Sequence, residues 1–176
     1  KVIETIPLEG KPEFSVTDLA GKIYVNIEDK NMVTVINATT LKVEANWPIT
    51  GAEEPTGLAL DNTTHRLFTV CGNKLMVVMD AISGKIITSL PIGDGCDGVT
   101  FDKELKRAYS SNGEGTVTVV QEENENTYHS YMGDHPRRLR CQRYECAEES
   151  ADRRIVFLPA NQRHSLYLLT AESLGH

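Results

Sequence analysis

Carboxylates recur in step with the apolar runs of this sequence. They stand just before an apolar run or at its start, at Glu13, Glu53, Glu54, Asp94 and Asp97. Carboxylates that converge on one point hold Ca²⁺ or an amine. The same residues would also suit the wet edge of a fold, because charged side chains usually stay in water. We predict an acidic collar that binds a ligand, with Ca²⁺ as a second-choice cofactor and no cofactor as the first.

Other residues with ligand or catalytic chemistry form no recognisable motif. His65 and His164 both precede a similar apolar run, so a structural role in a turn is favoured for them. Four residues could be assembled into a tetrahedral zinc site, although their spacing is irregular: His129, His135, Cys141 and Cys146. There is no Ser-His-Asp motif and no glycine loop for a phosphate. The motifs therefore predict no metal centre and name no catalytic residue.

The apolar runs that would position the carboxylates repeat along the chain. One unit contains runs at 57–60, 66–70, 74–79 and 85–91, separated by turns rich in Asn, Asp and Gly. Its last run occurs three times, at 1–8, 42–49 and 85–92. The spacings of about 41 and 43 residues suit a four-stranded propeller blade. Third runs such as Leu75–Met79 are apolar on both faces, as expected of strands covered on both sides.

The repeat predicts an all-β fold, a β-propeller of four-stranded antiparallel blades. We expect residues 1–176 to form one domain, or a fragment of one, with about 3.5 blades. The expected segments are blades at about 11–48, 55–91 and 96–132, an irregular insert at 131–152 and an incomplete blade at 153–171. Cys71 ends a run and is expected to be a small core filler, whereas Cys96 is expected in a loop.

The type of basic residue changes from lysine to arginine near residue 131. All nine lysines lie between Lys1 and Lys106, and seven of the nine arginines lie between Arg137 and Arg163. The stretch 137–146 could be a basic insert that contacts a polyanion, with Tyr144 stacking on a base. It could also be an exposed, poorly ordered loop, or a local shift of reading frame. The abrupt step favours the last two, and the net charge of −7 argues against nucleic-acid binding.

The second run of each unit resembles the hallmark of the YVTN-repeat β-propellers. Ile23-Tyr24-Val25-Asn26 lacks only the Thr, and Ala108-Tyr109-Ser110-Ser111-Asn112 keeps the Tyr and the Asn. The resemblance covers about residues 1–130 well and 153–172 weakly. It implies a propeller of the kind found in periplasmic, secreted or cell-surface proteins. Relatives with similar blades include lactonases and electron-transfer subunits of quinoprotein dehydrogenases.

We expect a non-enzymatic scaffold that binds a ligand or a protein partner through loops at the channel mouth. The alternative is a metal-dependent enzyme of the lactonase or quinoprotein-subunit type that uses the acidic collar. No apolar run approaches the roughly 18 residues that a membrane span needs. No secretory leader precedes the first run, and a trimmed start would look the same.

Closure of the propeller is the remaining question. The chain holds three whole units, one outer strand at its start and two inner strands at its end. Pairing these within one chain would give a cramped four-bladed ring, whereas YVTN-type blades resemble those of wider, usually seven-bladed rings. The chain could be a fragment of a longer propeller. We predict instead a homodimer in which each copy lends its first strand to the other's unfinished blade, giving about eight blades.

Overall fold

The computed structural model describes residues 2–134, 153–156 and 165–170. Within these ranges the fold consists of β-strands and one three-residue 3₁₀ helix, η1 (Glu28–Lys30), without an α-helix. No helix in this part of the chain has the length and apolar character that a membrane crossing requires. The basic stretch 137–146 and its rival interpretations fall outside the described residues, as do His135, His164, Cys141 and Cys146.

Three sheets of four antiparallel strands follow one another along the chain, and we call them blades 1, 2 and 3. Blade 1 contains β2 (Pro12–Thr17), β3 (Lys22–Ile27), β4 (Met32–Asn37) and β5 (Lys42–Pro48). Blade 2 contains β6 (Pro55–Asp61), β7 (Arg66–Cys71), β8 (Leu75–Asp80) and β9 (Ile86–Pro91). Blade 3 contains β10 (Cys96–Asp102), β11 (Arg107–Asn112), β12 (Thr116–Asn124) and β13 (Thr127–Asp134). The predicted all-β architecture of four-stranded antiparallel sheets is confirmed.

A fourth sheet joins the two ends of the chain. It has the strand order β1 (Val2–Pro7), β15 (Ser165–Thr170), β14 (Arg153–Val156), and β1 pairs antiparallel with β15. Two expectations are corrected here. Pairing within one chain was expected to be unfavourable, yet it is formed. The first strand was expected at the outer position of a blade, but it lies directly beside the second strand, where a blade has its third.

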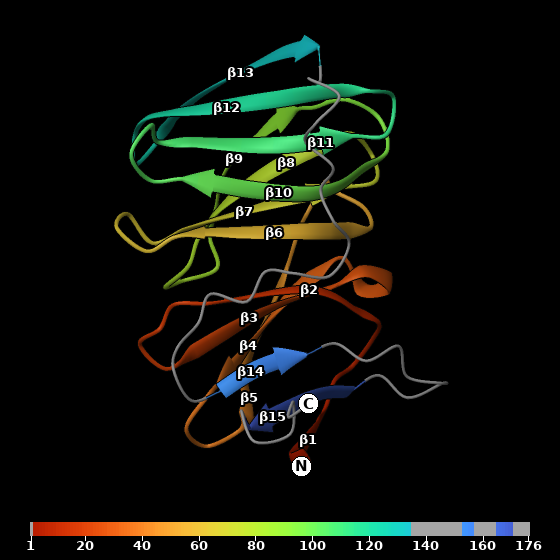
Figure 1. Ribbon diagram of the computed structural model, residues 1–176, viewed down its shortest axis with the longest axis vertical. Coiled ribbons are helices and arrows are strands. Elements are labelled where there is room, and N and C mark those ends of the chain that lie inside the picture. The colour runs from red at the N-terminus through yellow and green to blue at the C-terminus, as the bar shows by residue number, and fades with distance from the viewer. Residues whose placement is uncertain (1, 135–152, 157–164, 171–176) are drawn as a thin grey trace, which may run out of the picture.

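The sheets lie side by side in a row, with the β1–β15–β14 sheet at one end and blade 3 at the other (Figure 1). Among the described residues the row does not close on itself, so these residues form no four-bladed ring. One apolar cluster lies in each joint between neighbouring sheets. Strand β8 shows why: its alternating side chains Val77 and Met79 face blade 1, and Met76 and Val78 face blade 3, all fully buried.

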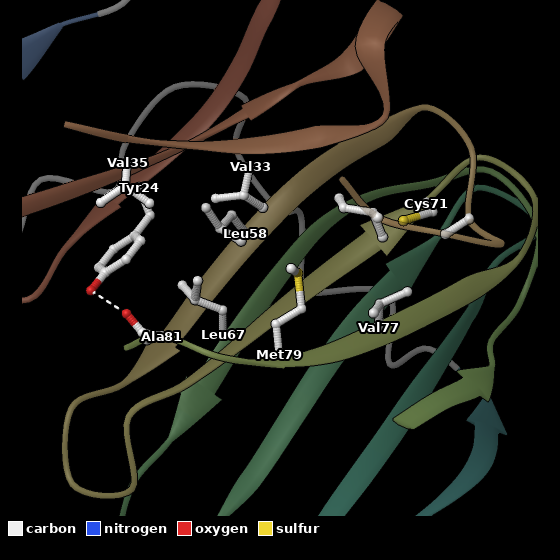
Figure 2. Close-up of a cluster of buried hydrophobic side chains, with 11 residues drawn as sticks. Tyr24, Val33, Val35, Leu58, Leu67, Cys71, Val77, Met79 and Ala81 are labelled. Carbon is white, nitrogen blue, oxygen red and sulfur yellow. Dashed lines mark hydrogen bonds between the residues drawn. The ribbon is translucent and has the colours of Figure 1, made fainter. Parts of the chain in front are cut away.

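The joint between blades 1 and 2 combines aliphatic packing with one long-range hydrogen bond (Figure 2). Val33 and Val35 of blade 1 pack against Leu58 and Leu67 of blade 2 in one buried cluster. The hydroxyl of Tyr24 donates to the carbonyl oxygen of Ala81, at 2.9 Å. Burial raises the pKa of this hydroxyl to about 12, so it remains a donor at any physiological pH. The bond ties the second strand of one blade to the third turn of the next.

Replacing Tyr24 by Phe removes this hydrogen bond and leaves the ring in place. We expect the free energy of unfolding to fall by about 1 kcal/mol, because the Ala81 carbonyl loses its donor in a buried joint. Tyr109 occupies the equivalent position in blade 3, opposite Val119 as Tyr24 is opposite Val35. No blade among the described residues follows blade 3, and Tyr109 is partly exposed, so Tyr109→Phe is the matched control and should change stability much less. Urea unfolding of both variants measures the difference, and equal losses would contradict the assigned role of the bond.

Candidate functional site

The loops that lead into the inner strands meet the loops between second and third strands at one edge of the row. This follows from antiparallel pairing, since the start of β6 lies opposite the end of β7. The backbone N–H of Gly72 donates to the carbonyl of Glu53 at 2.8 Å, and the N–H of Glu53 donates to Asn73 Oδ1 at 3.2 Å. The N–H of Glu54 donates to Asn31 Oδ1 of blade 1 at 2.8 Å. Loops of different blades are thus locked together.

The same arrangement occurs at blades 1 and 3. The N–H of Glu28 donates to the carbonyl of Lys11 at 2.9 Å, and the N–H of Gly113 donates to the carbonyl of Gly95 at 2.8 Å. Together these loops form an edge that we call the acidic rim. Its charged residues are Glu13, Glu28, Asp29, Glu53, Glu54, Asp94, Asp97 and Glu114, with Lys11, Lys30 and Lys74. Carboxylates outnumber amines here, so the rim carries net negative charge.

All the predicted collar residues lie on this rim, but they are not brought to one point. Lys11 Nζ lies 2.6 Å from Glu13 Oε1 and also binds Glu28, and these two carboxylates raise the pKa of Lys11. Lys74 Nζ lies 3.1 Å from Asp94 Oδ2 and lowers the pKa of the Asp94 carboxyl. The Lys74–Asp94 pair is exposed and the carboxylates paired with Lys11 are partly exposed, so solvent and salt screen these pairs and they add little to stability.

The remaining collar residues are exposed, whereas their cysteine neighbour is not. Glu53, Glu54 and Asp97 are open to solvent. Cys96 was expected in a loop, but it begins strand β10, is 3% exposed, and its thiol donates to the carbonyl of Cys71 at 3.2 Å. Burial raises the pKa of Cys96 to about 11 and that of Cys71 to about 12. Both thiols are therefore unreactive, and the prediction of Cys71 as a core filler is confirmed.

Residues that bind metals do not cluster in the described part of the chain. There, no three side chains of His, Cys, Asp or Glu come together in a way that could hold a metal ion. His129 lies exposed on β13, with its Nε2 atom 3.2 Å from Glu123 Oε1. His65 is exposed in the turn before β7 with φ 54°, and Lys106 has φ 53° at the equivalent place before β11. The conformation of His65 is thus one that the repeat imposes.

The feature that sequence analysis missed lies just behind the rim. Asn26 of β3 is fully buried, and its Nδ2 donates to the carbonyls of Thr56 and Gly57 on β6, at 3.0 and 3.1 Å. The same amide exchanges hydrogen bonds with the hydroxyl of Thr69 on β7. The sequence marks Asn26 only as part of the motif Ile23-Tyr24-Val25-Asn26. The sequence does contain a clue to this role. In the otherwise apolar run Ile23–Ile27, Asn26 is the one side chain with an amide, and a buried amide needs hydrogen-bond partners.

Blade 2 is connected to blade 3 at the same level. The Thr56 hydroxyl donates to the carbonyl of Cys96 at 3.0 Å. A Cβ atom on Gly57 would lie 2.9 Å from the Cα atom of Gly98, so the two inner strands approach so closely that only glycine fits. The three blades are thereby connected at this level through β3, β6 and β10. The loops of the acidic rim follow directly from the strands that these contacts connect.

Comparison with known proteins bears on the fold. No protein-family description matches the chain, and no curated protein matches it. Among solved structures it is similar to Kuenenia stuttgartiensis hydrazine synthase, with TM-score 0.62 and 17% identity over 73% of this chain and 38% of that one. It is also similar to the β-propeller domain of Myceliophteria thermophila Cps50 (Swd1), with TM-score 0.62 and 13% identity over 75% of this chain and 41% of that one. The chain has a β-propeller fold.

A further solved propeller supports the same fold and shows how much of a whole propeller this chain covers. The WD40 repeats of RRP9 give TM-score 0.61 at 17% identity, over 76% of this chain and 41% of that one. The chain therefore spans about two fifths of the solved propellers that it matches. It is a partial propeller, as the repeat predicted. At this identity the likeness concerns the fold alone, and the YVTN family remains a proposal.

The rim geometry leads to a prediction about calcium. We expect the melting temperature to stay constant on addition of millimolar Ca²⁺, because Glu13 and Asp94 are each paired with a lysine. Thermal melting over a Ca²⁺ titration measures this. A saturable rise that Asp94→Asn abolishes would contradict the expectation and would favour the metal-dependent enzyme instead. Glu104→Gln, in the turn before β11, is the control for a general effect of removing one carboxylate.

Proposed function

We propose that this chain is part of a non-enzymatic β-propeller scaffold that binds a positively charged partner at the acidic rim. The single observation that carries the proposal is an exposed row of carboxylates on loops that hydrogen bonds hold rigid. Glu53 and Glu54 illustrate it, since their backbones are fixed by Asn73 and Asn31 while their side chains stay in solvent. A rigid charged surface binds without the entropic cost of ordering its loops.

We propose that the partner is recognised by its positive charge and not by insertion into an apolar pocket. Exposed carboxylates attract basic segments over distances comparable to the Debye length and speed their association. Lys11 and Lys74 each pair with carboxylates of the rim, whereas Glu53 and Glu54 are exposed and form no ion pair within the described residues. We propose a basic peptide or the basic face of a protein as the partner. Propellers among the solved neighbours, such as the WD40 repeats of RRP9, share the fold on which this proposal rests.

We further propose that the chain belongs to the YVTN-repeat propellers and acts in the periplasm or outside the cell. The support for the family is the motif Ile23-Tyr24-Val25-Asn26, whose Tyr and Asn both make contacts between blades. The support for the location is the family resemblance. Detection of the tagged full-length protein in periplasmic or culture fractions tests the location.

Reversing one charge on the rim tests the proposed binding function. We expect Glu53→Lys to weaken binding of a fluorescent oligolysine peptide by roughly fivefold, because one attraction becomes one repulsion. Glu104→Lys makes the same change of net charge in the turn before β11, at the opposite edge, and should have little effect. Fluorescence anisotropy at low and high salt measures both. Equal loss in the two variants would show non-specific attraction to net charge and would contradict a rim site.

We also propose that a second copy of this chain covers the free face of blade 3. Tyr24, Val33 and Val35 of blade 1 are at most 3% exposed, and Phe68, Met76 and Val78 of blade 2 are fully buried, because the following blade covers each set. The equivalent residues of blade 3 are Tyr109, Val117 and Val119, which stay partly exposed, and beside them Tyr131 is 49% exposed.

A second copy suits this face because of blade number. Propellers close with about 4–8 blades, and one chain supplies three whole blades and one three-stranded sheet. Two copies would therefore reach about eight, the upper end of that range. The partner's end of the row would cover the free apolar face, as blade 2 covers blade 1.

Light scattering tests this association. We expect a dimer whose mass falls to that of a monomer on dilution, and we expect Val119→Asp to give a monomer at all concentrations, since it places a charge in the covered face. Val43→Asp is the matched control, because Val43 lies on the outer strand β5 and is 40% exposed. Circular dichroism should show both variants folded. A monomeric mass of the unmodified chain at every concentration would contradict the proposal.

A further inference from the structure

The joint between blades 2 and 3 contains a carboxylate without a hydrogen-bond partner. Glu122 lies near the end of β12 and is 2% exposed. Its side chain is on the same face as Val120, which packs in the apolar cluster of this joint. Neither Oε1 nor Oε2 accepts a hydrogen bond. An ionised carboxylate buried in this way is strongly unfavourable, so its charge state must depend on its surroundings.

Groups from both blades face Glu122. The charged and titratable ones are Asp61 at the end of β6, Arg66 on β7, Lys106 before β11 and Tyr128 on β13. Asp61 is 5% exposed and accepts hydrogen bonds from the backbone N–H groups of Thr63 and Thr64. The Asp61 carboxyl lies close enough to Glu122 to raise the pKa of the Glu122 carboxyl by like-charge repulsion.

Three side-chain donors near Glu122, those of Arg66, Thr64 and Tyr128, are engaged with other acceptors. The Arg66 guanidinium donates to Asp80 Oδ2 at 2.8 Å and to the carbonyl of Glu125 at 3.0 Å. The Thr64 hydroxyl donates its single proton to Asp61 Oδ2 at 2.5 Å. The Tyr128 hydroxyl donates to the carbonyl of Glu125 at 3.1 Å. No ion pair connects Glu122 to Arg66 or Lys106.

We propose that blades 2 and 3 pack most tightly while Glu122 carries a proton, and that loss of this proton loosens their joint. The protonated side chain is uncharged and therefore tolerates an apolar joint. The ionised side chain is a second buried negative charge next to Asp61. The joint is thus a pH-sensitive hinge within the row of blades.

The direction of the pH effect follows from linkage. Burial raises the pKa of the Glu122 carboxyl, and the neighbouring Asp61 carboxylate raises it further. Folding therefore takes up a proton wherever the pH lies between the ordinary glutamate value of about 4.3 and the raised value. Stability from this group is fully present below the ordinary value and is lost as the pH rises through the raised one.

Thermal melting of Glu122→Gln against the unmodified chain tests the proposal, because glutamine resembles the protonated acid and cannot ionise. We expect equal melting temperatures near pH 4.5 and an advantage for Glu122→Gln that grows to about 3 °C near pH 8. Glu104→Gln removes an exposed carboxylate and should show no such growth. A difference that stays the same at every pH would overturn the proposal, since it would reflect packing alone.

Hydrogen exchange locates the effect. We expect amide protection factors in β12 of the unmodified chain to fall several-fold between the two pH values, whereas those in β4 stay constant. In Glu122→Gln the factors of β12 should also stay constant. Should Glu122→Gln fail to fold, infrared spectra of the unmodified chain decide instead: a protonated carboxyl band that persists well above pH 4.3 supports the proposal, and its absence overturns it.

Discussion

The third strand of each blade has apolar side chains on both faces, and this constraint governs the fold. In β8, Met76, Val77, Val78 and Met79 are all fully buried, which a single sheet cannot achieve. Because burial of apolar surface is the main favourable term in folding, a blade gains most of its stability from its two neighbours. Each blade therefore needs a sheet on either side, and the chain is ordered as a row (Figure 1).

This dependence extends from the apolar joints to the surface. The amide of Asn26 and the hydroxyl of Thr56 connect inner strands of successive blades at the level of the acidic rim. Their partners are backbone carbonyls, whose positions the sheets fix, so the loops above them inherit a defined geometry. The charges of the rim are then displayed at set separations although the individual ion pairs contribute little. Packing between blades, and not the surface electrostatics, determines the shape that a partner would meet.

Much of the fold was predictable because it depends on local periodicity. Short apolar runs such as Lys22–Ile27 and Leu75–Asp80, with turn residues on either side, place strands to within a residue or two. Contacts between blades were harder to predict from the sequence. Asn26 and Thr69 are 43 residues apart, and neither strand alone indicates that the two side chains form a hydrogen bond. The collar prediction could not foresee that Lys11 would pair with Glu13 and Lys74 with Asp94, because those lysines lie in different segments of the repeat. Cys96 was misplaced because a glycine-rich surrounding resembles a loop.

Two buried polar side chains in different joints show how such joints can differ. Asn26, between blades 1 and 2, has its amide saturated by carbonyls and a hydroxyl, so it adds specificity at little electrostatic cost. Glu122, between blades 2 and 3, has no partner for either oxygen. A joint sealed by satisfied neutral groups has a stability that does not vary with pH. A joint with an unsatisfied titratable group has a stability linked to its proton, so blades of one repeat can be joined with unequal firmness although their backbones are alike.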